Sequence, residues 1–309
     1  MPLLRRWKCN VLLAMASLLL VPPQYAQSRK ASTIQISVVG DDRKPLAGAA
    51  IQGKSDSATL CSGVTDLQGH AALACGPAQD IHFVLFRIPY SRHGNGFGNR
   101  ELEYYTDRPA NLRLENGMLA IRALKEDYRG RDGVKRGFTS ARIQTKGKFA
   151  QAYGKFEARI KIPFGQGIWP AFWMMGDVRA GWPAKGEIDI VENIGREPAT
   201  VHGTIHGPGY SGAQAIGAPF SLPDGQRFCD DFHLFAVEWE PDAIRWYVDG
   251  RQYHAVTPAS LPRGARWVYD RPFYLLLNLA VGGDWPGDPD STSNFPQTMW
   301  IDYVRVYRR

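Results

Sequence analysis

The second half of the chain alternates apolar and polar residues at many positions. This alternation runs through residues 156–162, 235–239, 244–248 and 300–307. Successive side chains of a β-strand point to opposite faces, so a period of two indicates strands with one buried face. No long stretch repeats apolar residues at the spacing of a helix. The pattern therefore predicts an all-β protein.

Two local signals add detail to this prediction. Asn116-Gly117 lies between short apolar runs within residues 112–124, and this dipeptide is the strongest short-range signal for a β-hairpin. Phe273–Val281 is almost continuously apolar, which is typical of a central strand buried on both faces. Many strands at this spacing favour a two-sheet sandwich or jelly roll.

The first 90 residues divide into two parts. Residues 1–27 hold Arg5, Arg6 and Lys8, then the apolar run Val11–Val21, which is too short to span a bilayer comfortably. We interpret 1–27 as a signal peptide, and expect a secreted or periplasmic protein with no stable membrane insertion. The pattern of residues 28–90 predicts a small β-sandwich module, which precedes the main domain at 91–309.

Cysteine usage leaves one question open. Cys61 and Cys75 would suit a disulfide that stabilises the small module in an oxidising compartment, or they are two unpaired thiols. Cys229 is left over, and we expect it to be buried. No Cys-x-x-Cys or Cys/His cluster suggests a zinc site.

Composition and charge narrow the classes of partner. The formal net charge of the 309 residues is +7, and it falls to +4 without residues 1–27, which hold three basic residues and no acidic one. This modest charge and the lack of a basic run argue against nucleic-acid binding. Nine Trp residues suit either stacking on sugar rings or core packing. We expect a monomer.

Glu187-Ile-Asp-Ile-Val-Glu192 concentrates three carboxylates in six residues. In a strand, Glu187 and Asp189 share one face, and Glu192 joins them only if a bulge at Ile190-Val191 adds one residue. Retaining glycoside hydrolysis needs two neighbouring carboxyl groups, one of them with a raised pKa. The alternative is an acidic, solvated strand face.

Residues 95–309 resemble family 16 of the glycoside hydrolases, and within it the laminarinase-like endo-β-1,3-glucanases. The segments that carry the resemblance, in family order, are Gly98–Thr106, Phe138–Ile143, Gly147–Arg159, Gly167–Trp173, Gly186–Asn193, His202–His206, Asn278–Gly287 and Trp300–Tyr307. The resemblance implies a concanavalin-like jelly roll whose concave sheet binds a glycan. It also implies that Glu187 is the nucleophile, Glu192 the general acid/base and Asp189 the carboxylate between them.

The resemblance extends to substrate contacts outside the acidic stretch. It implies that six residues stack on sugar rings or bind sugar hydroxyl groups: Asn99, Arg142, Trp169, Trp173, His206 and Trp285. The alternatives are core packing for a tryptophan, an ion pair for Arg142 and a structural role for His206. His202 fits a structural role better, and Trp182 fits either role.

One family feature is missing from this chain. The usual opening strand, with a Phe-x-Asp-Glu-Phe-Asn-Gly-like segment, has no counterpart between Ile81 and Asn95. Either Ile81–Ile88 replaces that strand or the sheet has lost an edge. The same segment supplies the partners of Asp302 in the family's calcium site. We therefore expect no required cofactor, with Asp302 as the one calcium ligand retained.

The predicted activity is retaining endo-hydrolysis of β-1,3 bonds, with mixed β-1,3/1,4 bonds as an extension, in laminarin-like polysaccharides. A non-catalytic β-glucan-binding protein would use the same fold, although such relatives lose a catalytic carboxylate and both glutamates are kept here. A transglycosylase, or a hydrolase of lichenan, agarose or carrageenan, would keep the same carboxylates. Sulfated carrageenan would require a basic cleft, and no arginine cluster lies near the motifs.

Overall fold

The computed structural model describes residues 96–223 and 225–308, and it adds the backbone of short strands before them. Those earlier strands are β1 (Lys8–Cys9), β2 (Ser32–Ser37), β3 (Ala50–Ser55), β4 (Ala58–Val64) and β5 (His70–Cys75). The predicted signal peptide, the Cys61–Cys75 disulfide, the Ile81–Ile88 strand and the domain boundaries lie outside the described residues and remain predictions.

The described part of the chain is built almost entirely of strands, as the alternation predicted. Its strands are β6 (Glu103–Tyr105), β7 (Leu112–Glu115), β8 (Met118–Arg129), β9 (Lys135–Ser140), β10 (Arg142–Gln144), β11 (Gly154–Lys161), β12 (Ile168–Gly176), β13 (Glu187–Glu192), β14 (Thr200–His206), β15 (Ile216–Ser221), β16 (His233–Glu240), β17 (Ala243–Val248), β18 (Arg251–Val256), β19 (Phe273–Val281) and β20 (Gln297–Arg308). Three short 3₁₀ turns are Gly96–Gly98, Gly212–Gln214 and Pro258–Ser260.

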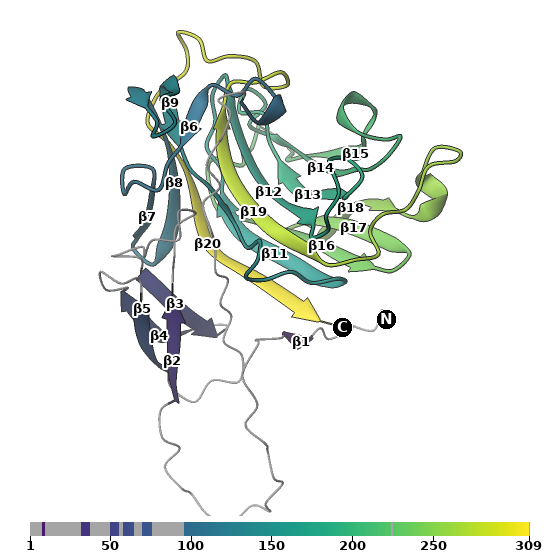
Figure 1. Cartoon of the computed structure of the whole chain (residues 1–309), viewed down its shortest axis with the longest axis horizontal. Helices are drawn as coiled ribbons and strands as arrows, with labels where there is room; N and C mark the ends of the chain where they lie inside the picture. The colour runs from purple at the N-terminus through teal and green to yellow at the C-terminus, as the bar shows by residue number, and fades with distance from the viewer. Residues whose placement is uncertain are drawn as a thin grey trace, which may run out of the picture.

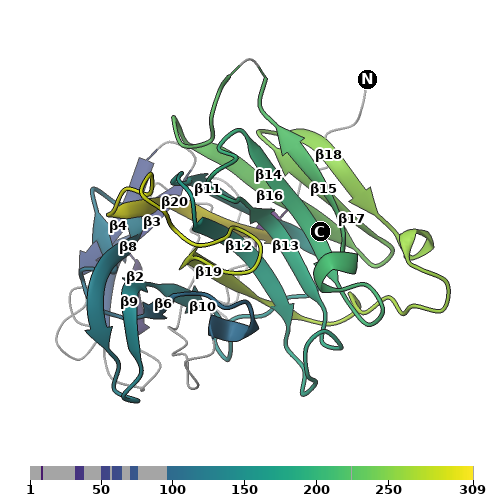
Figure 2. The same ribbon diagram turned by 90° about the horizontal axis from the view of Figure 1, so that it is seen from above.

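Two large sheets make the jelly roll. One has the order β18-β17-β16-β11-β20-β8-β9-β6, and the other has the order β10-β19-β12-β13-β14-β15. Figure 1 shows the two sheets packed face to face, with β12 and β19 strongly curved. The view from above in Figure 2 shows β12, β13 and β14 side by side, as their register requires. Neighbours such as β11 and β20 are far apart in sequence, so the order of the strands is a tertiary property.

The core fills the space between the sheets. The fully buried side chains of Phe172 on β12, Trp239 on β16 and Phe273 on β19 belong to one continuous apolar cluster. Every residue of Phe273–Val281 is buried, which confirms the predicted central strand. Burying a large apolar side chain contributes about 1.5–3 kcal/mol, so this cluster is the main source of stability.

The predicted hairpin at Asn116-Gly117 is confirmed. Strands β7 and β8 pair antiparallel on either side of it. Asn116 has φ 53° and Gly117 has φ 78°, and two successive positive φ angles are what a type I′ turn requires. Asn tolerates the left-handed region better than most residues, and Gly enters it without steric cost.

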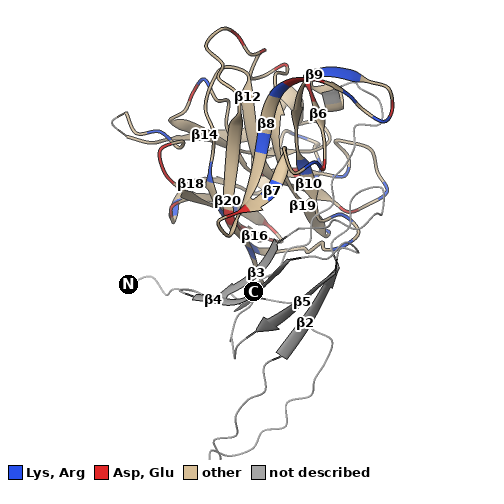
Figure 3. Cartoon of the chain, turned by 90° about the vertical axis from the view of Figure 1, so that its left-hand side faces the viewer, with Lys and Arg blue, Asp and Glu red and all other residues tan. Residues whose placement is uncertain are grey.

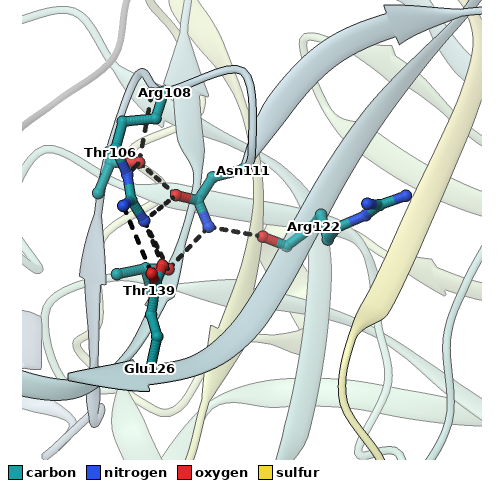
Figure 4. Close-up of polar contacts among 6 residues, drawn as sticks. All are labelled: Thr106, Arg108, Asn111, Arg122, Glu126 and Thr139. Carbon is teal, nitrogen blue, oxygen red and sulfur yellow. Dashed lines mark hydrogen bonds and ion pairs between the residues drawn. The ribbon is translucent and has the colours of Figure 1, made fainter. Parts of the chain in front are cut away.

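A buried polar network ties β6, β8 and β9 together at one end of the larger sheet (Figure 4). The Asn111 amide donates to the Thr139 hydroxyl at 2.9 Å and to the Arg122 carbonyl at 3.0 Å. Arg108 donates to the Asn111 carbonyl oxygen at 2.9 Å and forms an ion pair with Glu126. Leaving one such buried group without a partner costs about 1–3 kcal/mol. The network therefore secures β6, which leads out of the loop that carries Asn99.

Charge is dispersed over the outer surface. On the face shown in Figure 3, Lys and Arg are interspersed with acidic residues and form no continuous stripe. Within the described residues, no helix is long and apolar enough to serve as a bilayer-spanning segment. Cys229 is a free thiol and is only half-buried, so our expectation that it is fully buried was wrong.

Candidate active site

Strand β13 contains the bulge that the sequence predicted. Against β12, Asp189 pairs with Trp173 while Val191 pairs with Phe172, so Ile190 is an extra residue. The pairing with β14 shifts register in the same interval. One added residue reverses the alternation of side chains beyond it. The bulge thus brings the glutamates at the two ends of β13 onto one face.

The three carboxyl groups line the face of the smaller sheet that points away from the core. Phe172 and Met174 of β12 point into the core, whereas Trp173 and Met175 form part of a separate cluster on the opposite face. Directly paired residues share a face, and the partners of the three acids on β14 are also polar: Glu187 with His206, Asp189 with Thr204, and Glu192 with His202.

Each glutamate receives a hydrogen bond from a different tryptophan. The indole N–H of Trp182 donates to Glu187 Oε2 at 3.1 Å. The indole N–H of Trp169 donates to Glu192 Oε1 at 3.1 Å. An N–H donor favours the ionised form of the carboxyl group that accepts it. It also fixes the rotamer of the side chain, so both glutamates are oriented before a substrate arrives.

His206 binds the acidic row from β14. Its Nε2 lies 3.1 Å from Asp189 Oδ2 and 3.8 Å from Glu187 Oε1. The backbone N–H of Gly212 donates to His206 Nδ1 at 3.2 Å. A ring nitrogen that accepts a hydrogen bond carries no proton, so the proton is on Nε2 and points to the carboxyl groups.

This tautomer bears on metal binding. Glu187, Asp189 and His206 place ligand atoms within 4.8 Å of one another, the only such group among the described residues. A metal on Nε2 would move the ring proton to Nδ1, where it would oppose the N–H of Gly212. The three side chains therefore fit a hydrogen-bonded proton network better than a metal site.

Burial raises the pKa of all three acids, and the charge of Asp189 raises that of the two glutamates further. Burial, followed by the charge of Asp189, raises the pKa of Glu187 to about 8, against the lowering effects of His206, Arg142 and Trp182. Burial alone raises the pKa of Asp189 well above its usual range. Burial and then Asp189 raise the pKa of Glu192 well above its usual value. The site therefore holds more than one proton near neutral pH.

The surroundings decide which acid ionises first. Asp189 is the most buried of the three, with 2% of its surface exposed, so it keeps its proton most strongly. A neutral Asp189 no longer repels its neighbours, which lowers the pKa of both. Glu187 then has a cation, an imidazole and an indole that favour its anion. The arrangement supports an ionised Glu187 beside a protonated Glu192, the states that a nucleophile and an acid require.

Arg142 lies over the floor of this face. Its guanidinium carbon lies 4.7 Å from the ring centre of Trp173 and 4.4 Å from that of Phe97. Trp173 is 8% exposed, and its indole N–H donates to Asn278 Oδ1 at 2.7 Å. Arg142 covers one face of the Trp173 ring and little of the side chain is exposed, which disfavours the sugar stacking that we expected there. Trp173 instead holds Arg142 in place.

Trp285, Trp169 and His202 form an aromatic group beside Glu192. The ring of Trp285 meets that of Trp169 edge-on at 5.7 Å and that of His202 edge-on at 5.0 Å. Trp285 is 37% exposed, so much of its ring is open to a ligand. The exposed Asn99 lies on the neighbouring loop, where its carbonyl accepts the N–H of Asp284 at 2.8 Å. All six expected binding residues therefore lie at or around the acidic face, although Arg142 covers the ring of Trp173.

Asp302 lies elsewhere and has another role. Its carboxylate pairs with Arg159 at 3.1 Å across β11 and β20, and it belongs to no three-ligand group among the described residues. Calcium prefers several oxygen ligands around it, whereas Asp302 faces a guanidinium. The described residues do not fit a calcium site at Asp302.

Two residues of the site were not predicted to bind substrate, because the sequence left the role of Trp182 open and favoured a structural role for His202. Trp182 donates to Glu187, although it precedes β13 and could have been a core residue. His202 pairs with Glu192 in register, and burial lowers its pKa, so it stays neutral. The alternation of His202, Thr204 and His206 on β14 is the signal that could have placed His202 on this face.

Removing the indole N–H of Trp182 should shift the pH dependence of catalysis. The hydrogen bond from Trp182 lowers the pKa of Glu187, so Trp182→Phe raises that pKa. We expect the acidic limb of kcat/KM to move to higher pH by about one unit, since a charged hydrogen bond contributes about 1.5–3 kcal/mol and partial exposure weakens it. Rates measured across pH on one glycan check this.

Trp300→Phe is the matched control for this experiment. Trp300 lies on β20 in the other sheet and should leave the acidic limb unchanged. A Trp182→Phe profile that is lower at every pH without a shift would mean that Trp182 contacts only the substrate.

Comparison with known proteins agrees with this geometry. Residues 96–305 match the sequence family Glycosyl hydrolases family 16. A beta-glucanase of Rhodothermus marinus is 43% identical over 235 residues, which cover 71% of this chain and 78% of that protein. The laminarinase catalytic domain of Thermotoga maritima MSB8 has a TM-score of 0.68 at 50% identity, covering 72% of this chain and 91% of that one.

A second solved structure agrees equally well. The endo-beta-1,3-glucanase of Pyrococcus furiosus has a TM-score of 0.69 at 48% identity, and the match covers 72% of this chain and 88% of that one. The family match over residues 96–305 contains the whole acidic face. With its sequence, its jelly roll and its row of three acids in agreement, this chain belongs to glycosyl hydrolase family 16.

Proposed function

We propose that this chain is a retaining endo-β-1,3-glucanase that hydrolyses internal bonds of laminarin-like glucans, and that mixed β-1,3/1,4-glucans are secondary substrates. The observation that carries this proposal is the bulge of β13, which sets Glu187 and Glu192 on one face with the buried Asp189 between them. The names of the similar laminarinase and endo-β-1,3-glucanase support the choice of glucan.

The proposed reaction has two displacements. Glu187 attacks the anomeric carbon while Glu192 donates its proton to the departing glycosidic oxygen, which forms a glycosyl-enzyme ester. Glu192, now ionised, then takes a proton from water, and the water oxygen attacks the anomeric carbon and releases Glu187. Two inversions at one carbon give net retention.

Asp189 and His206 support these steps without touching the bond that breaks. The Nε2 of His206 lies 3.1 Å from Asp189 Oδ2. Since burial keeps Asp189 protonated, it adds little repulsion to the anion on Glu187. If Asp189 ionised, its charge would raise the pKa of both glutamates, which would impair the nucleophile.

Substrate contacts follow from exposure. Trp182, 49% exposed, and Trp285, 37% exposed, present open rings at the two ends of the acidic row. We propose that they stack on sugar faces, while Asn99 and Arg142 bind hydroxyl groups. We further propose a secreted or periplasmic monomer that binds no nucleic acid, which the apolar segment Val11–Val21 and the dispersed charge support.

Sulfated galactans should also be tested. We expected no arginine cluster near the motifs. Nevertheless, the charges of Lys146 and Arg142 lower the pKa of Lys185, and the charge of Glu187 raises it. Three cations therefore lie near the nucleophile end of the row. They do not by themselves favour a sulfated glycan, because they also offset the three acids.

The test is product profiling on laminarin, lichenan, agarose and carrageenan side by side. We expect laminarin to release reducing ends fastest, as oligosaccharides rather than glucose. Proton NMR of the first products should show the β-anomer before mutarotation. Agarose or carrageenan as the best substrate would replace the proposed glycan. Binding of laminarin without new reducing ends would instead indicate a glucan-binding protein, and longer products would indicate a transglycosylase.

A further inference from the structure

A second pair of acids lies buried beside the glycan-binding face. Glu101 is 5% exposed and Glu103, at the start of β6, is 3% exposed. Buried acids are rare unless they are paired or hydrogen-bonded. Neither residue touches the catalytic row, so the reaction does not explain them.

Glu101 accepts hydrogen bonds from two sides. The side-chain amide of Asn99 donates to Glu101 Oε1 at 3.0 Å. The Tyr105 hydroxyl donates to Glu101 Oε2 at 3.0 Å. The two bonds end on different oxygens of Glu101 and hold its carboxyl group from both sides. Its carboxylate therefore fixes the orientation of Asn99, a proposed sugar-binding residue.

Glu103 is held differently. Its Oε2 accepts the backbone N–H of Val281 at 2.6 Å. Its Oε1 is buried and accepts from no donor among the described residues, so this oxygen can form a hydrogen bond only if it carries a proton, and Glu101 is the acid two residues before it. Two carboxyl groups can bond each other only if one carries a proton. Burial, and next the charge of Glu101, raise the pKa of Glu103 well above its usual value.

We propose that Glu103 donates a shared proton to Glu101, and that this pair is the positioning element that orients Asn99 and the floor of the glycan-binding face. The proposal rests on the proposed function, because it assumes that Asn99 and Arg142 meet the substrate. Neither acid takes part in the chemistry, and both act through the groups that they hold.

The link to the floor is a chain of hydrogen bonds. The Asn278 side-chain amide donates to the Tyr105 hydroxyl at 3.3 Å, and Trp173 donates to Asn278 Oδ1 at 2.7 Å. Arg142 lies on the ring of Trp173. Glu101 thus fixes the position of Arg142 through Tyr105, Asn278 and Trp173.

A second link reaches the loop that carries Trp285. The backbone N–H of Leu102 donates to the Val281 carbonyl at 2.7 Å. Gly283 lies so close to the Asn99 carbonyl that an added Cβ would sit 3.1 Å from it. Arg100 forms an ion pair with Asp284. A shift of the segment before β6 would therefore displace the loop after β19 as well.

Loss of the shared proton should disturb this arrangement. The charged or titratable groups that face the pair are Tyr105 on β6 and Arg142 on β10, and Arg142 acts on the Tyr105 hydroxyl. A second buried anion would repel Glu101, and no cation pairs directly with either acid among the salt bridges of the described residues. Glycan binding should then weaken as the pH rises.

The experiment measures binding without turnover. Laminarihexaose is titrated by calorimetry into the full-length Glu187→Gln protein and into the same protein with Glu103→Gln or Glu103→Leu. In Glu103→Gln, the N–H of the new amide replaces the shared proton, and the oxygen of the amide still accepts the N–H of Val281. Because an amide does not titrate, the hydrogen bonds of this variant do not depend on pH. The Leu variant removes both bonds.

We expect Kd of the Glu187→Gln protein to rise about tenfold as the pH rises through the raised pKa of Glu103, one decade being about 1.4 kcal/mol of differential interaction. Adding Glu103→Gln should flatten this rise and keep the neutral-pH Kd within about threefold, while Glu103→Leu should weaken binding about tenfold at every pH. Parallel pH profiles with and without Glu103→Gln would overturn the proposal, even if the Leu variant does not fold.

A second measurement separates this proposal from the proposed function. In protein with ¹³C-labelled glutamate carboxyl groups, the signal that disappears in Glu103→Gln should titrate well above the usual value of 4.5. Titration near that value would overturn the shared proton. If no variant binds laminarihexaose at any pH but this signal still titrates high, the proposed substrate is wrong and the shared proton stands.

Discussion

Replacing Glu187 with Gln should lower kcat on laminarin by on the order of 10⁴ while oligosaccharide binding survives, since a lost nucleophile removes the covalent step. An amide is nearly isosteric with the carboxyl group, and its oxygen still accepts the N–H of Trp182. The fold and the orientation of the site should therefore persist. Initial rates and calorimetric titration on the same preparation measure the two effects.

Azide identifies the missing group in this experiment. With Glu187 shortened to Gly, azide can enter from the nucleophile's side and displace an aryl leaving group once, which gives an α-glycosyl azide. Glu157→Gln is the matched control, because Glu157 is also buried but lies on β11 in the other sheet. Residual activity of Glu187→Gln above about one hundredth of the wild type would contradict the nucleophile role.

Replacing Glu192 with Gln should lower kcat by an amount that depends on the leaving group of the substrate. Laminarin has a poor leaving group and needs a proton, so kcat should fall by on the order of 10³ or more. A dinitrophenyl glycoside needs no proton to depart, so the glycosyl-enzyme should still form and then accumulate. A burst of dinitrophenol followed by slow turnover is the expected trace.

The pH profile provides the second measurement on Glu192. Its pKa is raised by burial and by Asp189, so wild-type activity is present while Glu192 is protonated and falls as pH rises through that pKa. This alkaline limb should vanish for the dinitrophenyl glycoside in Glu192→Gln. Azide should rescue turnover and give the β-glycosyl azide. Equal losses on both substrates would mean that Glu192 does not serve as the acid.

The two predictions depend on each other through Asp189. Because the three acids interact, their titrations belong to the group and not to one residue. A shift seen in one variant therefore reports the protonation of the others. The opposite anomers of the azide products assign the roles independently of any titration.

Several parts of the fold and the site follow from sequence alone, because they depend on neighbours along the chain. A period of two along β11, β16, β17 and β20 reflects the pleat of a strand. The hairpin at Asn116-Gly117 follows from the φ angles that these residues tolerate. The bulge in β13 follows from the five-residue offset between Glu187 and Glu192, which alternation cannot reconcile with a shared face.

Contacts between distant segments required the tertiary structure. The pairing of His206 with Glu187 depends on the register of β14, and the cover of Trp173 by Arg142 depends on β10 lying beside β19. Alternation does not say which strands are neighbours or which way a long side chain turns. For this reason Trp173 was expected to bind sugar, and the role of Trp182 was left open.

The acids of this protein show the same division most clearly. That Glu187, Asp189 and Glu192 share a strand follows from their places along the chain. Their protonation depends on contacts between segments, since desolvation, the indole donors of Trp169 and Trp182, and the nearby His206 come from elsewhere in the chain. The same holds for Glu101 and Glu103, whose burial depends on packing against segments distant in the chain, and burial raises the pKa of Glu103.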